Sequence, residues 1–513
     1  MSSHIPASTE PPSTLKQSLA PVKVRYIPIS DLIPMPGDND LVTRTATADA
    51  PFPCRRCLQD ASPGESLHLV PYNPFPQQST SPYSGAGPIF IHAHASIVIG
   101  AGLGGCATAI ALHHHGHRVL CVLDKVRQFG RLGDSLGLGQ NAFDLLEKWG
   151  CEVDEIKRIG NQAPNMTIRK WHDGKELATQ PLMDMAGYIG HRGDYHDVFL
   201  EWVRRRGIDI RMGSEVVAFE DVDPQPGITL KSGEHLRADI IVAADGIKSL
   251  ARPLVLGSRD DPKSSGYACF RAFFRPTEEQ RRDEKLNRYM RDGDCVNFWI
   301  GPDLHLVQNT LRGGEEFNWI LTHKDEGDVP ESWFQEGNMK EVRRLVGSLD
   351  PKIRGIVQAT EKCLDWKICY REPLGSWVSP ESHRIALLGD SCHAHLPTSA
   401  QGASQAVESA GVLAVCLNQI QSREEVRVAT RVYEKLRFPR TRQSQTNGED
   451  LRDRWHGALK GVKEDKAIDP ESVKIRNRWL YDFDAEEDAA RRWLEVRNVV
   501  EAEFARDSLE PLC

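Results

Sequence analysis

A glycine-rich segment carries the clearest chemical signal in this sequence. Gly100, Gly102 and Gly105 have the spacing G-x-G-x-x-G, directly after the apolar run SIVI and before a helical pattern. In such a turn the first glycine permits the tight bend, the second lets the backbone approach a pyrophosphate, and the third lets the helix pack on the strand. Asp124 ends the next apolar run, where a carboxylate bonds an adenosine ribose. We therefore expect a dinucleotide site, for FAD or NAD; a purely structural turn is the alternative.

Two later segments also end apolar runs in polar residues and glycine. They are IIVAADGIKSLAR, residues 240–252, and IALLGDSCHAHLPTSAQGASQAVE, residues 385–408. A carboxylate there can accept hydrogen bonds from sugar hydroxyls, and the helix expected after the second segment presents free N–H groups at its N-terminus. The residues concerned are Asp245, Gly246 and Arg252 in the first segment and Gly389, Asp390, Pro397 and Gly402 in the second.

Strands and helices alternate around these segments. Residues 96–124 have the pattern of a strand, a helix and a second buried strand, the start of a βαβ unit. Helices are expected at about 140–149, 194–206 and 398–420, and short apolar runs from 266 to 377 indicate an antiparallel sheet. The predicted fold is α/β, with a Rossmann-like dinucleotide domain interleaved with an antiparallel-sheet substrate domain, followed by C-terminal helices. The predicted divisions are 1–22 (disordered tail), 23–95 (proline-rich leader), 96–265 and 379–420 (dinucleotide domain), 266–378 (substrate sheet) and 421–513 (helical region).

Composition narrows the class of partner. The 513 residues carry a formal charge of -8, which disfavours nucleic acid and anionic membrane surfaces as partners. The most apolar stretch, residues 96–112, is interrupted by glycines and is too short to span a membrane. Twelve scattered cysteines suit a reducing compartment, and no secretory signal pattern begins the chain. We expect a cytoplasmic protein with a small-molecule partner. The oligomeric state of the protein, monomer or homodimer, is left open.

With all three segments in this order, residues 96 to about 500 resemble the flavoprotein aromatic hydroxylases. These single-component FAD-dependent monooxygenases include salicylate hydroxylase and p-hydroxybenzoate hydroxylase. The resemblance implies bound FAD, NADPH or NADH as a transient co-substrate, and O2 as oxidant. In the family, O2 adds at flavin C4a, and the resulting hydroperoxide transfers OH to an electron-rich ring. WLYDFDAEEDA, residues 479–489, is similar to the tail of fungal salicylate-hydroxylase-like members, which implies phenolic or aromatic-acid substrates.

The resemblance also implies roles for individual residues. The three glycines would hold the FAD pyrophosphate, and Asp124, where Glu is more usual, the adenosine ribose. Arg192 matches the arginine of an Arg-x-Asp-Leu pattern that lies along the FAD, although Tyr195 replaces the leucine. Asp390 matches a Gly-Asp motif whose carboxylate bonds the ribityl chain. The segment from Asp245 to Arg252 matches the Asp-Gly motif that serves FAD and passing NADPH.

Some positions depart from the family pattern or stay unassigned. Ser135 and Gln140 depart from the family's stretch near the flavin edge, and Ser409 stands where many members have Asp. No catalytic residue is predicted; the candidates are His393, His395 and Arg271. The histidine tract at 113–117 ends a helix, so no metal site is expected. Six residues of the expected sheet are candidates for the substrate pocket or a sheet face: Arg271, Phe273, Phe298, Trp299, Asn309 and Trp319. For each aromatic residue among them, a place in the core is favoured over a place in the pocket.

The first fifth of the chain differs from the rest. It holds 15 of the 31 prolines, and residues 23–93 resemble the first half of a small family of unknown function. A truncated domain cannot close its own sheet, so we expect a fusion remnant or a wrongly joined gene.

The sequence thus predicts an FAD-dependent NAD(P)H monooxygenase that hydroxylates a phenolic or aromatic-acid substrate. One alternative keeps the fold but epoxidises, decarboxylates or dearomatises a polyketide or terpenoid. Another is an inactive flavoprotein that acts as a binding or regulatory module. An NAD-dependent dehydrogenase is disfavoured, because it needs neither Asp245-Gly246 nor Gly389-Asp390.

Overall fold

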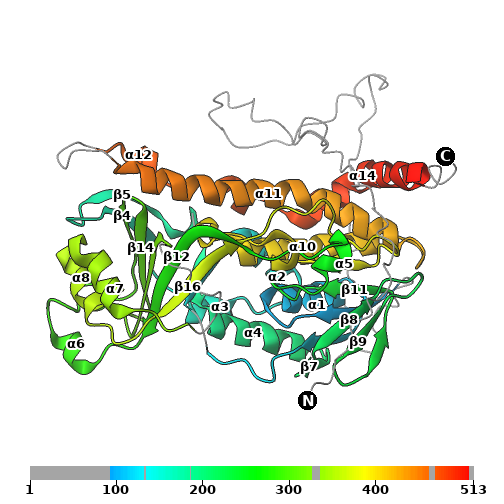
Figure 1. Ribbon diagram of the computed structural model, residues 1–513, viewed down its shortest axis with the longest axis horizontal. Coiled ribbons are helices and arrows are strands. Elements are labelled where there is room, and N and C mark those ends of the chain that lie inside the picture. The colour runs from blue at the N-terminus through cyan, green and yellow to red at the C-terminus, as the bar shows by residue number, and fades with distance from the viewer. Residues whose placement is uncertain (1–92, 132–133, 185–186, 326–334, 461–467, 508–513) are drawn as a thin grey trace, which may run out of the picture. The chain divides into compact units, whose positions relative to one another are not determined.

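A parallel five-stranded sheet is built from the apolar runs that end in the polar motifs (Figure 1). The computed structural model describes residues 93–131, 134–184, 187–325, 335–460 and 468–507, so the predictions for residues 1–92 lie outside the described residues. The strand order is β17-β11-β1-β2-β7. Its strands are β1 (Ala95–Ile99), β2 (Arg118–Asp124), β7 (Ile210–Met212), β11 (Ile240–Ala243) and β17 (Ile385–Leu387). Strands covered on both faces need continuous apolar runs, and β11 is buried throughout.

Helices and two small sheets surround this parallel sheet. Helix α1 (Leu103–His114) connects β1 to β2, which confirms the predicted βαβ start. A two-stranded ribbon joins β3 (Ser135–Leu138) to β6 (Tyr188–His191). A three-stranded sheet holds β8 (Val216–Glu220), β9 (Gly227–Leu230) and β10 (His235–Arg237). The other helices here are α2 (Gln140–Lys148), α3 (Asp154–Ile159), α4 (Arg192–Arg205) and α5 (Arg252–Leu256).

The second large element of the fold is a sheet of seven strands, in the order β16-β12-β15-β14-β13-β4-β5. Its strands are β4 (Asn165–Lys170), β5 (Glu176–Pro181), β12 (Lys263–Phe274), β13 (Val296–Gly301), β14 (Leu304–Leu311), β15 (Glu316–Lys324) and β16 (Leu364–Tyr370). Helices α7 (Met339–Leu345) and α8 (Pro351–Gln358) cover one face and bury Trp299 and Trp319 there; α6 (Glu278–Arg282) lies after β12. Because side chains alternate along a strand, Arg271, Phe273 and Asn309 lie on the opposite face.

Two strands of this sheet come from residues predicted for the dinucleotide domain. β4 pairs parallel with β13, whereas the predicted sheet is antiparallel, and β4 pairs antiparallel with β5. Met166 and Ile168 of β4 then share a buried cluster with Phe298 and Ile300 of β13. The alternating pattern of β4 reveals a half-buried strand but not which sheet it joins. The domain boundaries stay a prediction.

Helices complete the chain, as the charged C-terminal pattern predicts. They are α9 (Asp390–His393), α10 (Gly402–Asn418), α11 (Val426–Ala458), α12 (Pro470–Val473), α13 (Arg478–Tyr481) and α14 (Ala485–Asp507). α10 starts later than predicted, because residues 397–399 form a 3-10 turn and Ala400 has φ +49°. α10 packs against α1, α2, α11 and α14, while α11 runs on to contact β13 and β14 (Figure 1). In the part of the chain that the structure describes, no helix is both long and apolar enough to cross a bilayer.

Candidate active site

Four neighbouring strands bring the three sequence motifs to one edge of the parallel sheet. β17, β11, β1 and β2 are adjacent and parallel, so their carboxyl ends meet, and ligands of such sheets bind at that edge. Backbone hydrogen bonds join the motifs there. Gly100 N–H donates to the Leu123 carbonyl at 2.7 Å, and Leu388 N–H donates to the Ala243 carbonyl at 3.0 Å. Residues almost 290 positions apart in the chain therefore share one site.

The three glycines of the first motif have three different surroundings. Gly100 has φ +96°, and a Cβ there would lie 2.3 Å from the Ala244 carbonyl oxygen. A Cβ on Gly105 would lie 1.8 Å from the carbonyl oxygen of Gly100, so α1 can approach β1 only with glycine at this position. Gly102 has no atom within 4 Å of its Cβ position and caps α1 without a side-chain hydrogen bond. The open side of the turn is therefore at Gly102, where a pyrophosphate needs close backbone contact.

Asp124 lies beside this turn at the end of β2. One carboxylate oxygen accepts the Ala101 N–H at 2.8 Å, and the other accepts the Val126 N–H at 2.8 Å. The side chain is half-buried, and each oxygen keeps a further lone pair for a ligand hydroxyl. Asp124 thus fixes the glycine turn, and its contact with a ribose stays a prediction.

Asp390 and Arg192 are exposed side chains that interact electrostatically. Both side chains are solvent-accessible, yet dense protein around Asp390 raises the pKa of its carboxyl group, an effect that Arg192 partly opposes. Burial likewise lowers the pKa of Arg192, and Asp390 opposes that shift. The pair and the open face at Gly102 fit the sugar hydroxyls and pyrophosphate of FAD.

The second motif supports the third. An Asp245 carboxylate oxygen accepts the Leu250 N–H at 2.8 Å, and Gly246 has φ +80° with open space at its Cβ position. Arg252 is 1% exposed; its guanidinium pairs with Asp260 and donates to the Ser391 carbonyl at 2.9 Å. Arg252 therefore positions the segment after Gly389, and direct contact with a cofactor stays a prediction.

The third motif leads into α10. Pro397 begins the 3-10 turn, and Gly402 is the first helical residue, with no side-chain hydrogen bond at the cap. His393 Nε2 lies 3.0 Å from Ser409 Oγ, and burial lowers the pKa of His393 well below its usual value. Burial also lowers the pKa of His395 to about 4. Both rings are neutral near pH 7 and are weak bases there, so a catalytic part for either stays a prediction.

Arg271 lies where the larger sheet meets the loop before β3. It forms an ion pair with Asp134, and its guanidinium lies 3.3 Å from the centre of the Trp366 ring. Burial lowers the pKa of Arg271 to about 9. Nearby, Ser135 Oγ donates to Asn309 Oδ1 at 2.6 Å and accepts from Asn318 Nδ2 at 2.7 Å. These contacts seal the seam between the ribbon and the sheet.

The predicted pocket aromatics are packed by the chain itself. The rings of Phe273 and His191 are 4.5 Å apart, and those of Phe298 and Trp455 are 5.3 Å apart. Trp299 and Trp319 lie in the core on the helix-covered face, where the sequence favoured them. Sequence reasoning missed two features, the Arg271–Asp134 pair and a buried cluster around Glu408. Charged side chains at core-facing positions of apolar runs were the available signal for both.

Comparisons with known proteins agree with this geometry. The family described as an FAD binding domain matches residues 94–289. A family of unknown function matches residues 51–102, which overlaps the predicted N-terminal resemblance at 23–93 and extends past its end. Asperlicin C monooxygenase from Petromyces alliaceus is 31% identical over 429 residues, which cover 81% of this chain and 91% of that protein. FAD-dependent monooxygenase fmqB from Aspergillus fumigatus is 32% identical over 311 residues, which cover 58% of this chain and 73% of that protein.

Solved structures show the same relationship. CtdE in complex with FAD and a substrate matches with a TM-score of 0.72 and 28% identity, over 80% of this chain and all of that one. A salicylate hydroxylase substrate complex matches with a TM-score of 0.66 and 20% identity. The match covers 78% of this chain and 97% of that one, and it supports the fold. The chain therefore belongs to the FAD-dependent monooxygenases of the aromatic hydroxylase family.

Proposed function

We propose that this monooxygenase transfers one oxygen atom of O2 to an electron-rich aromatic ring of a small molecule, with NAD(P)H as the electron donor. The observation that supports it is the meeting of three motifs at one sheet edge, together with the polar contacts that join the larger sheet to residues 134–135. FAD, when bound, supplies the electron transfer and the oxygen activation. A phenolic or aromatic-acid substrate is our first candidate.

The chain's own groups hold and orient the cofactor in this proposal. The Gly102 backbone and the N-terminus of α1 receive the pyrophosphate, Asp124 the ribose, and Asp390 the hydroxyls of the ribityl chain. The segment from Asp245 to Gly246 lines the same edge. Arg192 balances the negative charge of Asp390, because the negative charges of the cofactor phosphates and of this carboxylate would otherwise repel each other.

In this proposal, the larger sheet excludes water from the place where the flavin and the substrate react. Oxygen activated on a flavin is lost as hydrogen peroxide when water reaches it, so the reacting ring needs a dry surround. The Arg271–Asp134 pair and the Ser135–Asn309–Asn318 hydrogen bonds join the sheet to the ribbon beside Arg192, whose backbone N–H donates to the Asp134 carbonyl at 2.9 Å. Arg271 is matched by Asp134 and stacked on Trp366, so we assign it to holding the wall rather than to acid–base chemistry.

A second candidate is epoxidation or dearomatisation of an aromatic ring in a larger natural product. It is favoured by the 31% identity to a protein whose name gives asperlicin C, rather than salicylate, as substrate. The salicylate hydroxylase likeness, at 20% identity, supports the fold and not the substrate.

Product analysis separates these candidates. The FAD-loaded full chain is incubated with NADPH or NADH, ¹⁸O-labelled O2, and a panel of phenols, aromatic acids and asperlicin C, while peroxide is trapped. The first candidate predicts a rearomatised phenol that carries one ¹⁸O atom; the second predicts a labelled product that has lost aromaticity. NAD(P)H oxidation that yields only peroxide with every compound contradicts both candidates. No reduction with any ligand indicates a binding module instead.

A further inference from the structure

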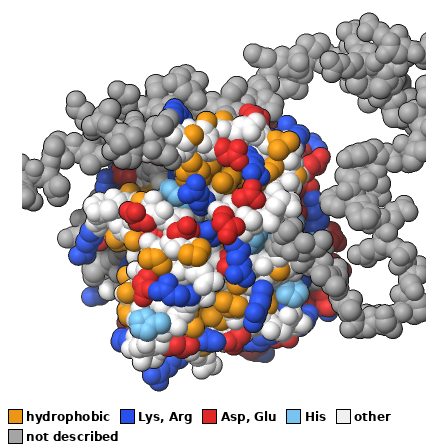
Figure 2. All heavy atoms as spheres, turned by 90° about the vertical axis from the view of Figure 1, so that its right-hand side faces the viewer, with side chains coloured by type: hydrophobic (Ala, Val, Ile, Leu, Met, Phe, Trp, Pro, Cys, Tyr) orange, Lys and Arg blue, Asp and Glu red, His pale blue; other side chains and the backbone are white. Residues whose placement is uncertain are grey.

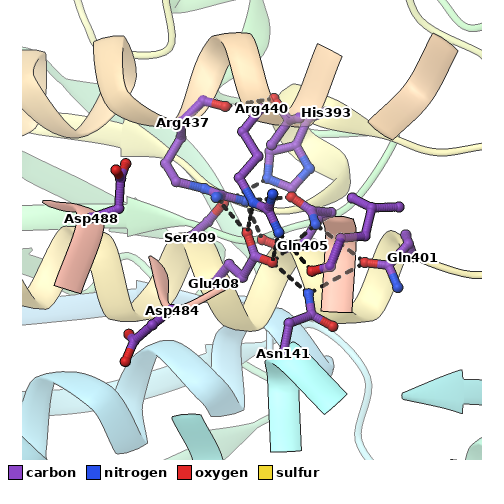
Figure 3. Close-up of polar contacts among 12 residues, drawn as sticks. Asn141, His393, Gln401, Gln405, Glu408, Ser409, Arg437, Arg440, Asp484 and Asp488 are labelled. Atoms are coloured by element: carbon purple, nitrogen blue, oxygen red, sulfur yellow. Dashed lines mark hydrogen bonds and ion pairs between the residues drawn. The ribbon is translucent and has the colours of Figure 1, made fainter. Parts of the chain in front are cut away.

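A buried ion cluster joins α10 to α11 (Figure 3). Glu408 of α10 is 0% exposed, and Arg437 and Arg440 of α11 are 1% and 3% exposed. Glu408 Oε2 accepts from Arg437 Nη1 at 2.6 Å and from Arg440 Nε at 2.7 Å. Arg440 Nη2 also donates to Glu408 Oε1 at 2.7 Å. One carboxylate thus bridges two guanidinium groups in the interior.

Neutral groups hold this cluster in place. Gln405 Oε1 accepts from Arg437 Nη2 at 2.6 Å, and Ser409 Oγ accepts from Arg437 Nε at 3.1 Å. Asn141 of α2 donates to Glu408, and Arg440 donates to the Leu480 carbonyl at 2.8 Å. The cluster therefore ties α2, α10, α11 and α13 together, and both guanidinium groups are buried.

The cluster carries one net positive charge. Burial acts to raise the pKa of Glu408, but Arg440 and Arg437 outweigh it and lower that pKa to about 2, so the carboxylate is ionised. Arginine stays protonated in proteins, and two guanidinium groups against one carboxylate leave a single cation. Asp484 and Asp488 are also drawn in Figure 3, without a dashed line to the cluster. They pair with Lys148 and with Arg491 and Arg492.

The cluster lies one to two turns behind the N-terminus of α10. Gln401 caps α10, its Oε1 accepts from Gln405 Nε2 at 3.2 Å, and Glu408 lies six residues after Gly402. At 1.5 Å per residue, Glu408 is about 9 Å from that N-terminus. The fixed cation therefore stands in line with the positive end of the helix dipole.

We propose that this cluster is a positioning element that raises the reduction potential of bound FAD. The inference rests on the proposed placement of the flavin at the N-terminus of α10. Reduction adds negative charge to the flavin, and a buried cation behind it stabilises that charge. With an effective dielectric constant near 20 and a separation of about 10 Å, one unit of charge changes the ratio of reduced to oxidised flavin roughly tenfold.

A charge series in the FAD-loaded full chain tests this proposal. Arg437→Met leaves the cluster neutral, Glu408→Gln leaves two positive charges, and the double variant restores one. The ratio of reduced to oxidised flavin is read at equilibrium with a redox dye of known potential. We expect about a tenfold lower ratio for Arg437→Met, about a tenfold higher ratio for Glu408→Gln, and the wild-type ratio for the double variant. Shifts of both single variants in one direction overturn the proposal, because they indicate loosened packing.

A matched pair at Ser409 covers the case in which Glu408→Gln fails to fold. Ser409→Asp places a second carboxylate beside Arg437 Nε, and Ser409→Asn has almost the same size without the charge. His393 also contacts Ser409 Oγ, and a carboxylate there raises the pKa of His393, so the dye equilibrium is measured at about pH 8.5. We expect the Asp variant to hold about tenfold less reduced flavin than the Asn variant. Equal ratios overturn the proposal.

FAD affinity distinguishes failure of the inference from failure of the proposed site. If Asp390→Ala weakens FAD binding while the charge series leaves the dye equilibrium unchanged, the proposed FAD site is supported and the electrostatic role of the cluster is contradicted. If Asp390→Ala leaves FAD affinity at the wild-type value, the proposed FAD site is contradicted. The electrostatic role is then contradicted too, because it assumes that site.

Discussion

Gly102 and Gly105 are chemically identical residues with opposite demands on the structure. Gly102 faces open space and has φ -70°, which any residue adopts, whereas Gly105 is pressed against the Gly100 carbonyl. Gly105 therefore serves packing, and we propose that Gly102 serves a ligand.

We expect Gly102→Ala to change the free energy of unfolding by less than about 0.5 kcal/mol, since the added methyl group meets no atom. FAD affinity should fall at least tenfold, because the methyl group blocks close approach to the pyrophosphate. Urea unfolding of the apoprotein and flavin-fluorescence titration measure the two effects. Gly105→Ala is the control and should cost about 3 kcal/mol of stability by overpacking. Equal stability loss in both variants contradicts the assignment.

Asp390 is the second residue-scale test. Asp390→Ala should weaken FAD retention on gel filtration, and Asp390→Asn should retain part of it, because an amide oxygen still accepts hydrogen bonds from sugar hydroxyls. Unfolding temperatures of the apoproteins serve as the check that the fold persists. Wild-type flavin content in Asp390→Ala counts against the assigned contact.

At the scale of elements, the larger sheet and the ribbon of β3 and β6 are held together by polar side chains. β12 contributes Arg271, and the loop before β3 contributes Asp134. Asn309 of β14 and Asn318 of β15 reach Ser135 at the start of β3. These are contacts between elements more than a hundred residues apart, and we propose that they help to exclude water from the active site.

Arg271→Met tests this seam. It leaves Asp134 as a buried, unpaired carboxylate, so we expect a loss of about 3 kcal/mol of stability in urea unfolding. The double variant Arg271→Met with Asp134→Asn should recover most of that loss, because no buried charge is left unpaired. In turnover, the single variant should release a larger share of the NAD(P)H electrons as hydrogen peroxide. Unchanged peroxide yield argues against a water-excluding role for the seam.

At the scale of the whole molecule, α11 packs against α10 and runs on to contact the larger sheet (Figure 1). Its C-terminal end carries the buried His456, which pairs with the buried His305. His456 Nε2 lies 2.8 Å from His305 Nδ1 of β14. Burial lowers the pKa of His305 to about 3 and that of His456 to about 4. Both rings are therefore neutral in the folded protein over the range in which unfolded histidine takes up a proton.

Stability should fall as the pH is lowered from about 6.5 to about 4. In that window the unfolded chain binds protons at these histidines and the folded chain does not, so each histidine contributes a slope of up to about 1.4 kcal/mol per pH unit. Urea unfolding at several pH values measures the slope. His456→Asn should make it shallower. An unchanged slope in that variant would assign the acid sensitivity to other groups.

Much of the candidate site was predictable from the sequence. Gly100, Asp245 and Asp390 each follow an apolar run, and local spacing is enough to place such residues at strand ends. The α/β fold follows from the same alternation, and so does the family resemblance. The predicted helix after Pro397 was misplaced by only a few residues, because a 3-10 turn and the left-handed Ala400 precede it.

The sequence by itself determined the order of the motifs, the strand ends that carry them and the kind of ligand they suit, since these depend on neighbours within a few residues. Only the tertiary structure decided that β4 joins the larger sheet, that Arg271 is matched by Asp134, and that Glu408 bridges two arginines. A buried charge must find a partner wherever the packed elements bring one. That partner lies far away along the chain for Arg271, so local patterns show the need for a partner and not its identity.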